Sequence, residues 1–353
     1  MGNSQASNAI LAKARAMYGR RLTGHNYQDL LNCRDLPELI SYLKTRTSYA
    51  DALQEVNPVA TRRASLEALL RQNLFEQYAS LCRYEMNIGH DFYRYFIIRS
   101  EVQAISNRLQ ELHARDDDAA YIYNMPEFIK KHSKLNPAAV GAARDFKTLV
   151  FALEGTPYEK VLRPFADDPN FSLEENGILE LEAGLDGYVY QEMEQIASTK
   201  LQGKSREDML YLLRRQSDLQ AIADIYRLKS MLHADRSFIE GRVSVKVSNM
   251  TARQLTHLME AHDAKDVIHR LVATPYANEF YGASFRYIEE GVQKIDYRWH
   301  LKNLRFSTNP SVVLFCYIFL AENELTNIIH IIEGVRYDLS PDEIQEMLVG
   351  VGD

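Results

Sequence analysis

The feature that most constrains the fold of this chain is an internal repeat, in which one helical pattern occurs three times. The stretch from Thr23 to Arg46 aligns without a gap with residues 251–274, and a shift of 110 residues aligns it with a middle segment that begins at Ser133. Each copy carries a potential helix cap, an aspartate and a cluster of aliphatic residues, and a tyrosine follows. A period this long predicts three related units rather than a short solenoid repeat.

The residue types at the aligned positions are those that short helices need at their starts and on their buried faces. A Ser, Thr or Asp side chain at a helix start accepts a hydrogen bond from a free backbone N–H group, and an acidic one also suits the helix dipole. Aliphatic residues at positions i, i+1 and i+4 form one buried face. We therefore expect two short capped helices in each copy, followed by a tyrosine in the core. The caps of the first helix are Thr23, Ser133 and Thr251, and the caps of the second are Asp35, Asp145 and Asp263. The aliphatic residues of the buried face, which we call the anchors, are Leu39, Ile40 and Leu43 in the first copy, Leu149, Val150 and Leu153 in the second, and Val267, Ile268 and Leu271 in the third. The tyrosines are Tyr49, Tyr158 and Tyr276.

A second signature closes each copy. The hexamers "SEVQAI", "SDLQAI" and "NELTNI" place an acid at the same position of a helical pattern, at Glu101, Asp218 and Glu324. Two signatures in the same order, three times, indicate three divergent copies of a helical unit of roughly 115 residues. The sequence therefore predicts three tandem homologous domains in a pseudo-threefold arrangement. Their boundaries are predicted at residues 1–115, 116–232 and 233–353.

Helical periodicity dominates the rest of the chain. Residues 61–87 carry apolar side chains at three- and four-residue steps, which is typical of an amphipathic helix. Alternating strand patterns are rare, and "GRVSVKVSN" at residues 241–249 is the one candidate strand. The predicted fold class is therefore all-α.

Composition limits the function classes. Apolar residues make up 46% of the chain and the net charge is −7, so a folded protein without an overall basic footprint for nucleic acid is expected. Three widely separated cysteines, Cys33, Cys82 and Cys316, favour a reducing compartment over a disulfide framework. The most apolar run, residues 311–321, stops at Glu322, whereas a membrane span needs about 20 residues. We therefore expect contact with a membrane only through a partner.

A search for sites finds one candidate metal cluster. His262, Asp266 and His269 share one helix face, and zinc is bound by such residue types. The other two copies carry different residues at these positions, so solvated polar side chains are the simpler interpretation. The doublet of His90 and Asp91 is interpreted in the same way. Phosphate-binding and nucleophile motifs do not occur in the sequence, and we expect no catalytic residues, no cofactor and no metal.

Interface residues are a second kind of candidate. The chain has 21 tyrosines, a residue type suited to surfaces that are buried in one state and wet in another. Basic residues beside the short repeated helices are solvated or face an acidic partner. The candidates for partner contact are Tyr27, Arg46, Arg253 and Arg270.

The two ends of the chain resemble a known family. Residues 8–53, "NAILAKARAMYGRRLTGHNYQDLLNCRDLPELISYLKTRTSYADAL", and the closing "AENELTNIIHIIEGVRYDLSPDEIQEML" resemble the terminal signatures of the C subunit of bacterial and archaeal V-type (A/V-type) rotary ATPases. The eukaryotic counterpart is the d subunit of the vacuolar ATPase. The likeness spans the whole chain, and the three repeats suit the three-domain build of that family.

The resemblance implies an all-helical, funnel-shaped and non-catalytic rotor part. Such a protein joins the central-stalk subunits to the proteolipid ring and transmits torque for ATP-coupled proton or sodium transport. It would be a monomer when isolated, peripheral on the cytoplasmic face of the membrane. Two alternatives stay open from the residues alone: a generic helical scaffold that binds another protein, and an enzyme of unrecognised type that uses His262, Asp266 and His269.

Overall fold

Helices form every regular element of the part of the chain that the structure describes. The computed structural model describes residues 2–83, 89–114, 132–243, 246–280 and 288–351, and no strand occurs among them. This confirms the predicted all-α class. The strand prediction for residues 241–249 is wrong, because its described residues form turns and bends in which Val243 and Val247 are buried. Valines that fill a helical core do not need a strand partner.

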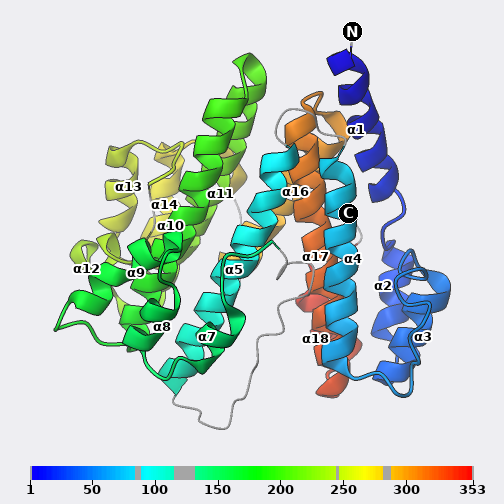
Figure 1. Cartoon of the computed structure of the whole chain (residues 1–353). Helices are drawn as coiled ribbons and strands as arrows, with labels where there is room; N and C mark the ends of the chain where they lie inside the picture. The colour runs from blue at the N-terminus through cyan, green and yellow to red at the C-terminus, as the bar shows by residue number, and fades with distance from the viewer. Residues whose placement is uncertain (1, 84–88, 115–131, 244–245, 281–287, 352–353) are drawn as a thin grey trace. The chain divides into compact units, whose positions relative to one another are not determined.

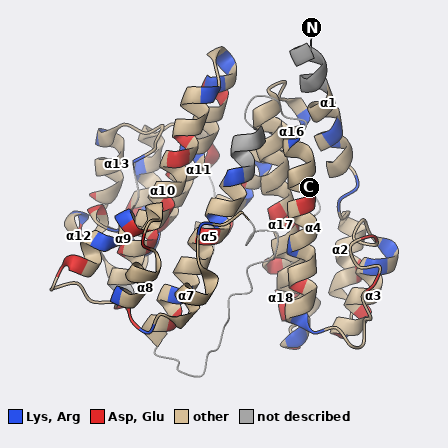
Figure 2. Cartoon of the chain, viewed as in Figure 1, with Lys and Arg blue, Asp and Glu red and all other residues tan. Residues whose placement is uncertain are grey.

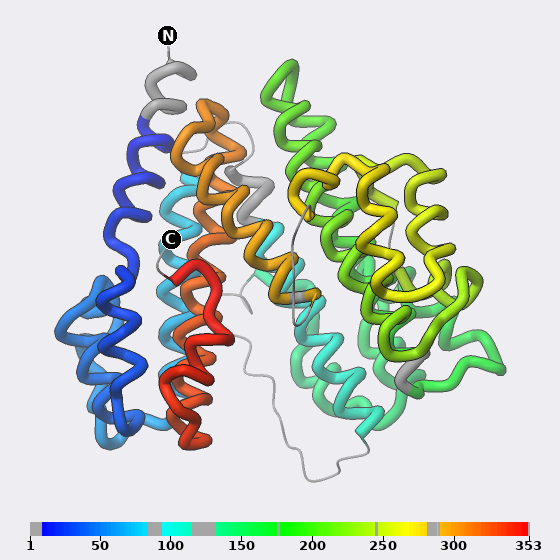
Figure 3. Tube along the Cα trace, turned by 180° about the vertical axis from the view of Figure 1, so that it is seen from behind, coloured from blue at the N-terminus to red at the C-terminus, as the bar shows by residue number. Residues whose placement is uncertain are grey.

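The chain divides into two compact units, one of residues 1–93 and 284–353 and one of residues 94–283. In the first, which we call unit 1, the long helix α17 lies at the centre, and α1, α4 and α16 pack along it (Figures 1 and 3). The helices of unit 1 are α1 (Gly2–Tyr18), α2 (Gly24–Leu31), α3 (Leu36–Arg46), α4 (Arg63–Cys82), α16 (Ile288–Phe306), α17 (Pro310–Arg336) and α18 (Pro341–Glu346).

The second unit, unit 2, contains three long helices, α5, α10 and α11. α10 packs against α11, α9 packs on α10, and α14 packs on α11. Its elements are α5 (Gly89–Ala114, of which unit 2 holds residues 94–114), α7 (Pro137–Ala142), α8 (Phe146–Ala152), α9 (Pro157–Asp167), α10 (Glu175–Lys200), α11 (Gly203–Leu232), α12 (Arg236–Glu240), α13 (Ala252–Met259), α14 (Ala264–Arg270), the 3-10 turn η1 (Leu271–Ala273) and α15 (Ala277–Phe280). Figure 2 shows both signs of charge along the helices of each unit, as the mixed composition predicts.

The three aspartates of the repeat have the same role, as predicted. Asp35, Asp145 and Asp263 cap α3, α8 and α14, and each accepts a hydrogen bond at 2.8 Å from the backbone N–H three residues later. That bond is the main reason why the pKa values of Asp145 and Asp263 are lowered. The carboxylates thus satisfy a backbone donor that the helix itself leaves free.

Two of the three predicted first caps are correct. Thr23 caps α2 and Thr251 caps α13, each in a capping box. The prediction for Ser133 is wrong, because Asn136 caps α7. Both residue types suit a cap, but the Ser133 hydroxyl is bonded to Glu101 instead.

The predicted anchors and tyrosines lie in the core. Eight of the nine aliphatic anchors are at most 2% exposed, and Ile268 is half-buried. The exposed fractions of Tyr49, Tyr158 and Tyr276 are 7%, 1% and 0%. The three domain boundaries and the threefold, funnel-like arrangement stay predictions.

The apolar run at residues 311–321 continues as a helix beyond Glu322. α17 spans 27 residues and is long and apolar enough, by length and composition, to cross a membrane. However, 72% of its most apolar window is buried inside the protein, as in the central helix of a helical core. Glutamate is a good helix former, so Glu322 and Glu324 do not end the helix, and Glu324 is paired with Arg21 inside unit 1.

Candidate functional site

The repeated acid and the repeated tyrosine meet in space, and this is the main polar feature of the buried core. In three places a tyrosine hydroxyl donates to a buried carboxylate. The pairs are Tyr49 with Glu324, Tyr158 with Glu101, and Tyr276 with Asp218. We call them the Glu324, Glu101 and Asp218 networks. Each one fixes a pair of short helices to a long helix, because the tyrosine follows the short helices and the acid belongs to the long one.

The Glu101 network lies in unit 2 and contains four residues. The Glu101 side chain on α5 is 3% exposed. Its Oε2 accepts from the Tyr158 hydroxyl at 2.5 Å, and its Oε1 accepts from Ser133 Oγ at 2.6 Å and from the Lys134 backbone N–H at 2.7 Å. Both oxygens therefore have donors, which a buried carboxylate requires.

The Asp218 network repeats this geometry on α11. Asp218 is 1% exposed, and its Oδ2 accepts from the Tyr276 hydroxyl at 2.5 Å and from the Asn249 backbone N–H at 2.8 Å. The Ser248 hydroxyl donates to the other oxygen, Oδ1. Burial raises the pKa of the Asp218 carboxyl despite these hydrogen bonds, because the charged form is taken out of water.

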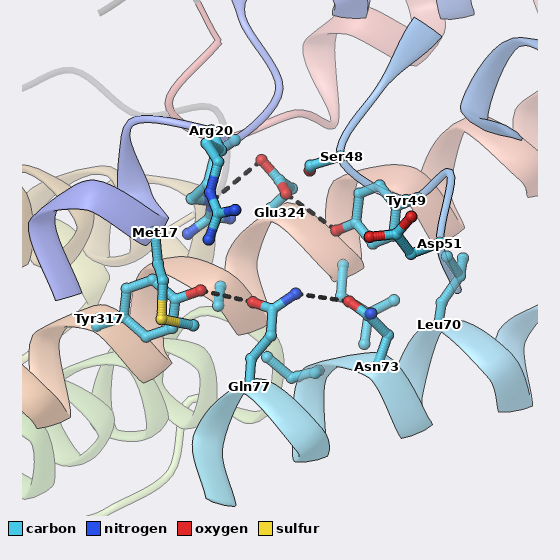
Figure 4. A pocket seen from close by; sticks show the side chains of 14 residues that line it. Met17, Arg20, Ser48, Tyr49, Asp51, Leu70, Asn73, Gln77, Tyr317 and Glu324 are labelled. Carbon is cyan, nitrogen blue, oxygen red and sulfur yellow. Dashed lines mark hydrogen bonds and ion pairs between the residues drawn. The ribbon is translucent and has the colours of Figure 1, made fainter. Parts of the chain in front are cut away.

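The Glu324 network, in unit 1, differs because a cation takes part. The Tyr49 hydroxyl donates to Glu324 Oε1 at 2.9 Å, and the Leu22 backbone N–H donates to Oε2 at 2.8 Å. Arg21 Nε also donates to Oε2, at 3.0 Å, in the position where the other networks use a serine. Figure 4 shows Glu324 and the Tyr49 hydroxyl joined by their hydrogen bond. Burial works against the charged guanidinium of Arg21, but its pKa is raised because Glu324 lies beside it.

The three tyrosines stay protonated donors. Burial is the first cause that raises the pKa of each phenol, and the neighbouring carboxylate is the second. A phenol whose pKa is raised, next to a carboxylate that already accepts two other hydrogen bonds, holds its proton and does not transfer it. The chemistry of these networks is therefore cohesion between helices, and a buried donor or acceptor that loses its partner costs about 1–3 kcal/mol.

The networks differ at the residue three positions before the acid. That residue is Arg215 in the Asp218 network, where the side chain is fully buried and forms an ion pair with Glu279, with one hydrogen bond of 2.9 Å from Nη1 and a 2.8 Å contact from Nη2. Its guanidinium also lies 5.7 Å from the centre of the Tyr276 ring. The corresponding residue is Ala321 in the Glu324 network and Ile98 in the Glu101 network.

A cavity adjoins each network that lacks this arginine. The cavity in unit 1, of about 180 Å³, is lined by Ala321, Glu324 and Tyr49 among others. The cavity in unit 2, of about 300 Å³, is lined by Ile98, Glu101 and Tyr158 among others. From the sequence, Arg21 is one of the basic residues beside the short helices that are solvated or face an acidic partner, whereas the structure pairs it with Glu324 inside unit 1. Arg215 and both cavities were not predicted; a comparison of the three copies at the position three residues before the acid would have singled out Arg215.

The predicted partner residues belong to both units, two to each, and they differ in exposure. Tyr27 is 5% exposed and its hydroxyl accepts from Asn327 at 3.3 Å, so it offers almost no surface to a partner. Arg46 and Arg253 are exposed at the end of α3 and the start of α13. Arg270 bonds Asp266 at 2.9 Å and the His257 backbone carbonyl at 2.8 Å, and thereby links α14 to α13.

The histidine face of α14 is occupied by internal bonds. Asp266 accepts from Arg270 and from the His262 backbone N–H, and the His262 ring is exposed and 3.9 Å from Asp263. Within the described residues, no three His, Cys, Asp or Glu side chains are placed to hold a metal ion. The side chains of His90 and Asp91 lie outside the described residues.

The fold and these networks define an all-helical protein whose buried polar groups join helices to one another. Residues 10–347 match the family described as the ATP synthase (C/AC39) subunit, and the chain belongs to that family. The family is a structural, non-catalytic component of V/A-type rotary ATPases, so the partners of this chain are within such a complex, at a membrane. A search of curated proteins gives no match to the chain.

Proposed function

We propose that this chain is the rotor adapter of its rotary ATPase: it links the central stalk to the membrane ring of proteolipid subunits and transmits torque between them. ATP hydrolysis or synthesis takes place elsewhere in the complex, and the ions, protons or sodium, pass through the membrane part. The observation that carries the proposal is the family match over almost the whole chain. Its location would be peripheral, on the cytoplasmic face of the membrane.

The buried networks support a part that bears a mechanical load. A rotor spacer has to keep its helices in place while torque passes through, and short helices held by apolar contact alone can slide. Each network adds hydrogen bonds of fixed direction between a short-helix pair and a long helix. Hydrogen bonds to charged groups contribute about 1.5–3 kcal/mol each, so three such sites resist displacement.

We also propose the three-domain organisation, with domains at residues 1–115, 116–232 and 233–353. It is supported by the three aspartate caps and the three networks, which have matching geometry. Each acid is bonded to the tyrosine that follows the next short-helix pair along the sequence, and Glu324, in the last copy, is bonded to Tyr49 in the first. Neighbouring copies are therefore tied together by the same contact.

The test is purification of the native complex. The chain, carrying a tag in its own host, is purified from membranes in a mild detergent, and the co-purified proteins are identified by mass spectrometry. The proposal requires stalk subunits and proteolipid together. If the chain instead retrieves soluble proteins without either of them, it is a helical scaffold and the proposal is wrong.

The short-helix ends are our candidates for stalk contact, and Arg253 is the sharpest probe. Arg253→Glu reverses an exposed charge, whereas Arg270→Glu would also break the link to His257. At an interface of standard size we expect Arg253→Glu to weaken stalk binding by about 1–4 kcal/mol. Arg206→Glu, an exposed arginine on α11, is the matched control. Equal affinity of the Arg253→Glu variant and this control would remove α13 from the stalk site.

A further inference from the structure

The cavity of unit 1 is a small polar chamber beside the Glu324 network. It lies where the residues that follow α1 and α3 meet α4 and α17 (Figure 4). Its volume of about 180 Å³ is far below the roughly 300–1,000 Å³ of a pocket for drug-sized ligands. At about 30 Å³ for each water molecule, it holds roughly six waters, or one small group.

The buried acid of this cavity, Glu324, has donors on both oxygens, whereas its buried arginine, Arg21, has a donor atom without an acceptor among the described residues. Glu324 Oε2 accepts from Arg21 Nε and Leu22 N–H, and Oε1 accepts from Tyr49. Arg21 Nη1, by contrast, is buried and has no hydrogen-bond partner within the described residues. Among the residues that line the cavity it is the one buried side-chain atom in this condition. What the chamber lacks is therefore an acceptor.

Further donors line the same chamber. Arg20 is exposed and lies across the cavity from Asn73 in Figure 4. The carbonyl oxygen of Asn73 accepts from Gln77 at 2.5 Å, which leaves the Asn73 amide N–H groups for a ligand, and Ser48 adds a hydroxyl at the rim. Asp51 also lines the cavity, but it is exposed, so solvent screens its repulsion of an anion.

The comparison between networks shows why this chamber is open. At the position of Ala321, the Asp218 network has Arg215, whose buried side chain brings both volume and a cation and is paired with a carboxylate of the chain itself, Glu279. In unit 1 the volume is left open, and Arg20 and Arg21 supply the cations from the segment after α1. The carboxylate that would correspond to Glu279 is Ala52 by the repeat, so the chain does not supply it.

We propose that this cavity binds one oxyanion group, a carboxylate or a phosphate, between Arg20 and Arg21. Arg21 Nη1 donates to one oxygen at the closed end, and the Arg20 guanidinium closes over the group from the solvent side. Asn73 and Ser48 donate to the remaining oxygens. Such charge-assisted bonds are the strong ones, and the inference stands independently of the rotor function.

The experiment uses the full chain and two probes. Inorganic phosphate represents a free anion, and acetyl-glutamate amide represents an acidic side chain of a partner protein. Binding is measured by isothermal titration calorimetry at constant ionic strength, with sodium chloride as the blank. Tighter binding of phosphate assigns the site to a free anion, and tighter binding of acetyl-glutamate amide assigns it to a partner's carboxylate.

Two variants and one control locate the site. Arg20→Gln removes an exposed cation, and we expect it to weaken the tighter probe by about tenfold or more. Ala321→Leu fills the cavity without adding charge and should abolish binding. Arg34→Gln, an exposed arginine of the same unit that does not line the cavity, should bind like the parent chain.

Either of two results overturns the proposal. One is that neither probe binds more than chloride does. The other is that the Arg20→Gln variant, with an unchanged circular dichroism spectrum, binds as well as the Arg34→Gln control. In both cases water fills the chamber. Because Arg20→Gln decides the matter alone, a failure of Ala321→Leu to fold does not affect the conclusion.

Discussion

Replacing Tyr49 by phenylalanine removes one oxygen atom and tests whether the acid–tyrosine networks hold the helices together. In unit 1 the Tyr49 hydroxyl donates to Glu324 Oε1 at 2.9 Å, and the Glu324 side chain is 7% exposed. A hydrogen bond to a charged group contributes about 1.5–3 kcal/mol. The adjoining cavity of about 180 Å³ lets water reach the abandoned oxygen, so we expect the lower end of that range.

The same change in the Asp218 network should cost more. There, the buried side chain of Arg215 stands where the unit 1 network has Ala321, and we expect it to limit the access of water to the oxygen that Tyr276→Phe leaves without the phenol. We expect about 1.5 kcal/mol for Tyr49→Phe and about 3 kcal/mol for Tyr276→Phe. At roughly 2–4 °C per kcal/mol for units of this size, the melting temperatures fall by about 3–6 °C and 6–12 °C.

The assay is thermal and urea unfolding of the full chain, followed by circular dichroism and calorimetry. Tyr337→Phe is the control, because this tyrosine is 64% exposed and its ring contact with Arg336 survives the change. A double-mutant cycle of Tyr49→Phe with Glu324→Gln isolates the pair. If Tyr49→Phe and Tyr276→Phe are as stable as Tyr337→Phe, or if Tyr49→Phe is the more damaging, our account of the networks is wrong.

Three further predictions concern single groups. Arg215→Ala leaves Glu279 without its cation and should lower the free energy of unfolding by about 3 kcal/mol. This is the lower end of the range for a broken buried pair, because Glu279 is 28% exposed. Urea unfolding measures the change, and a loss no larger than that of Arg206→Ala would contradict the prediction. Asp218 has a raised pKa in the folded state, so it binds its proton more tightly there, and its contribution to stability falls as pH rises from the unfolded value of about 3.9 through the folded value. The stability of the parent chain relative to Asp218→Asn should therefore decline between those pH values, and an increase would refute the assignment. Asp35→Ala removes the cap of α3 and should cost about 1 kcal/mol, while Asp35→Asn, which keeps an acceptor, should cost less in the same urea assay.

The features that could be predicted from the sequence are local. A cap needs only the residue at a helix start and the N–H group three positions on, so Asp35, Asp145 and Asp263 were predictable from spacing. The prediction that Ser133 is a cap was wrong because spacing alone cannot choose between two residues that both suit a cap, and Asn136, three residues further on, caps α7. Apolar and polar side chains alternate at residues 241–249 as they do in a strand, but this pattern does not show whether a partner strand is present.

The acid–tyrosine contacts are not local, and this is why they were not predicted. Tyr158 and Tyr276 lie 57 and 58 residues from their acids, and Tyr49 lies 275 residues from Glu324. The repeat indicated that acids and tyrosines both matter, but it could not state that they pair. The predicted pseudo-threefold arrangement makes the last copy a neighbour of the first, but the repeat could not show that Glu324 and Tyr49 are the residues that bond.

The divergence of the three networks separates what the fold requires from what one copy can do alone. All three keep an acid, a tyrosine hydroxyl and a backbone N–H donor, so these groups are needed wherever a short-helix pair is fixed to a long helix. The residue three positions before the acid is Arg215, Ile98 or Ala321, so the fold tolerates either a large or a small side chain at that position. Arg215 closes that place with an internal ion pair, whereas Ala321 leaves a donor in the unit 1 cavity without an acceptor among the described residues. The cavity beside the Glu101 network is open as well, so open space alone does not imply a ligand. The unit 1 chamber differs because a buried donor, Arg21 Nη1, has no acceptor among the described residues, and it therefore points to a group that the chain itself does not supply.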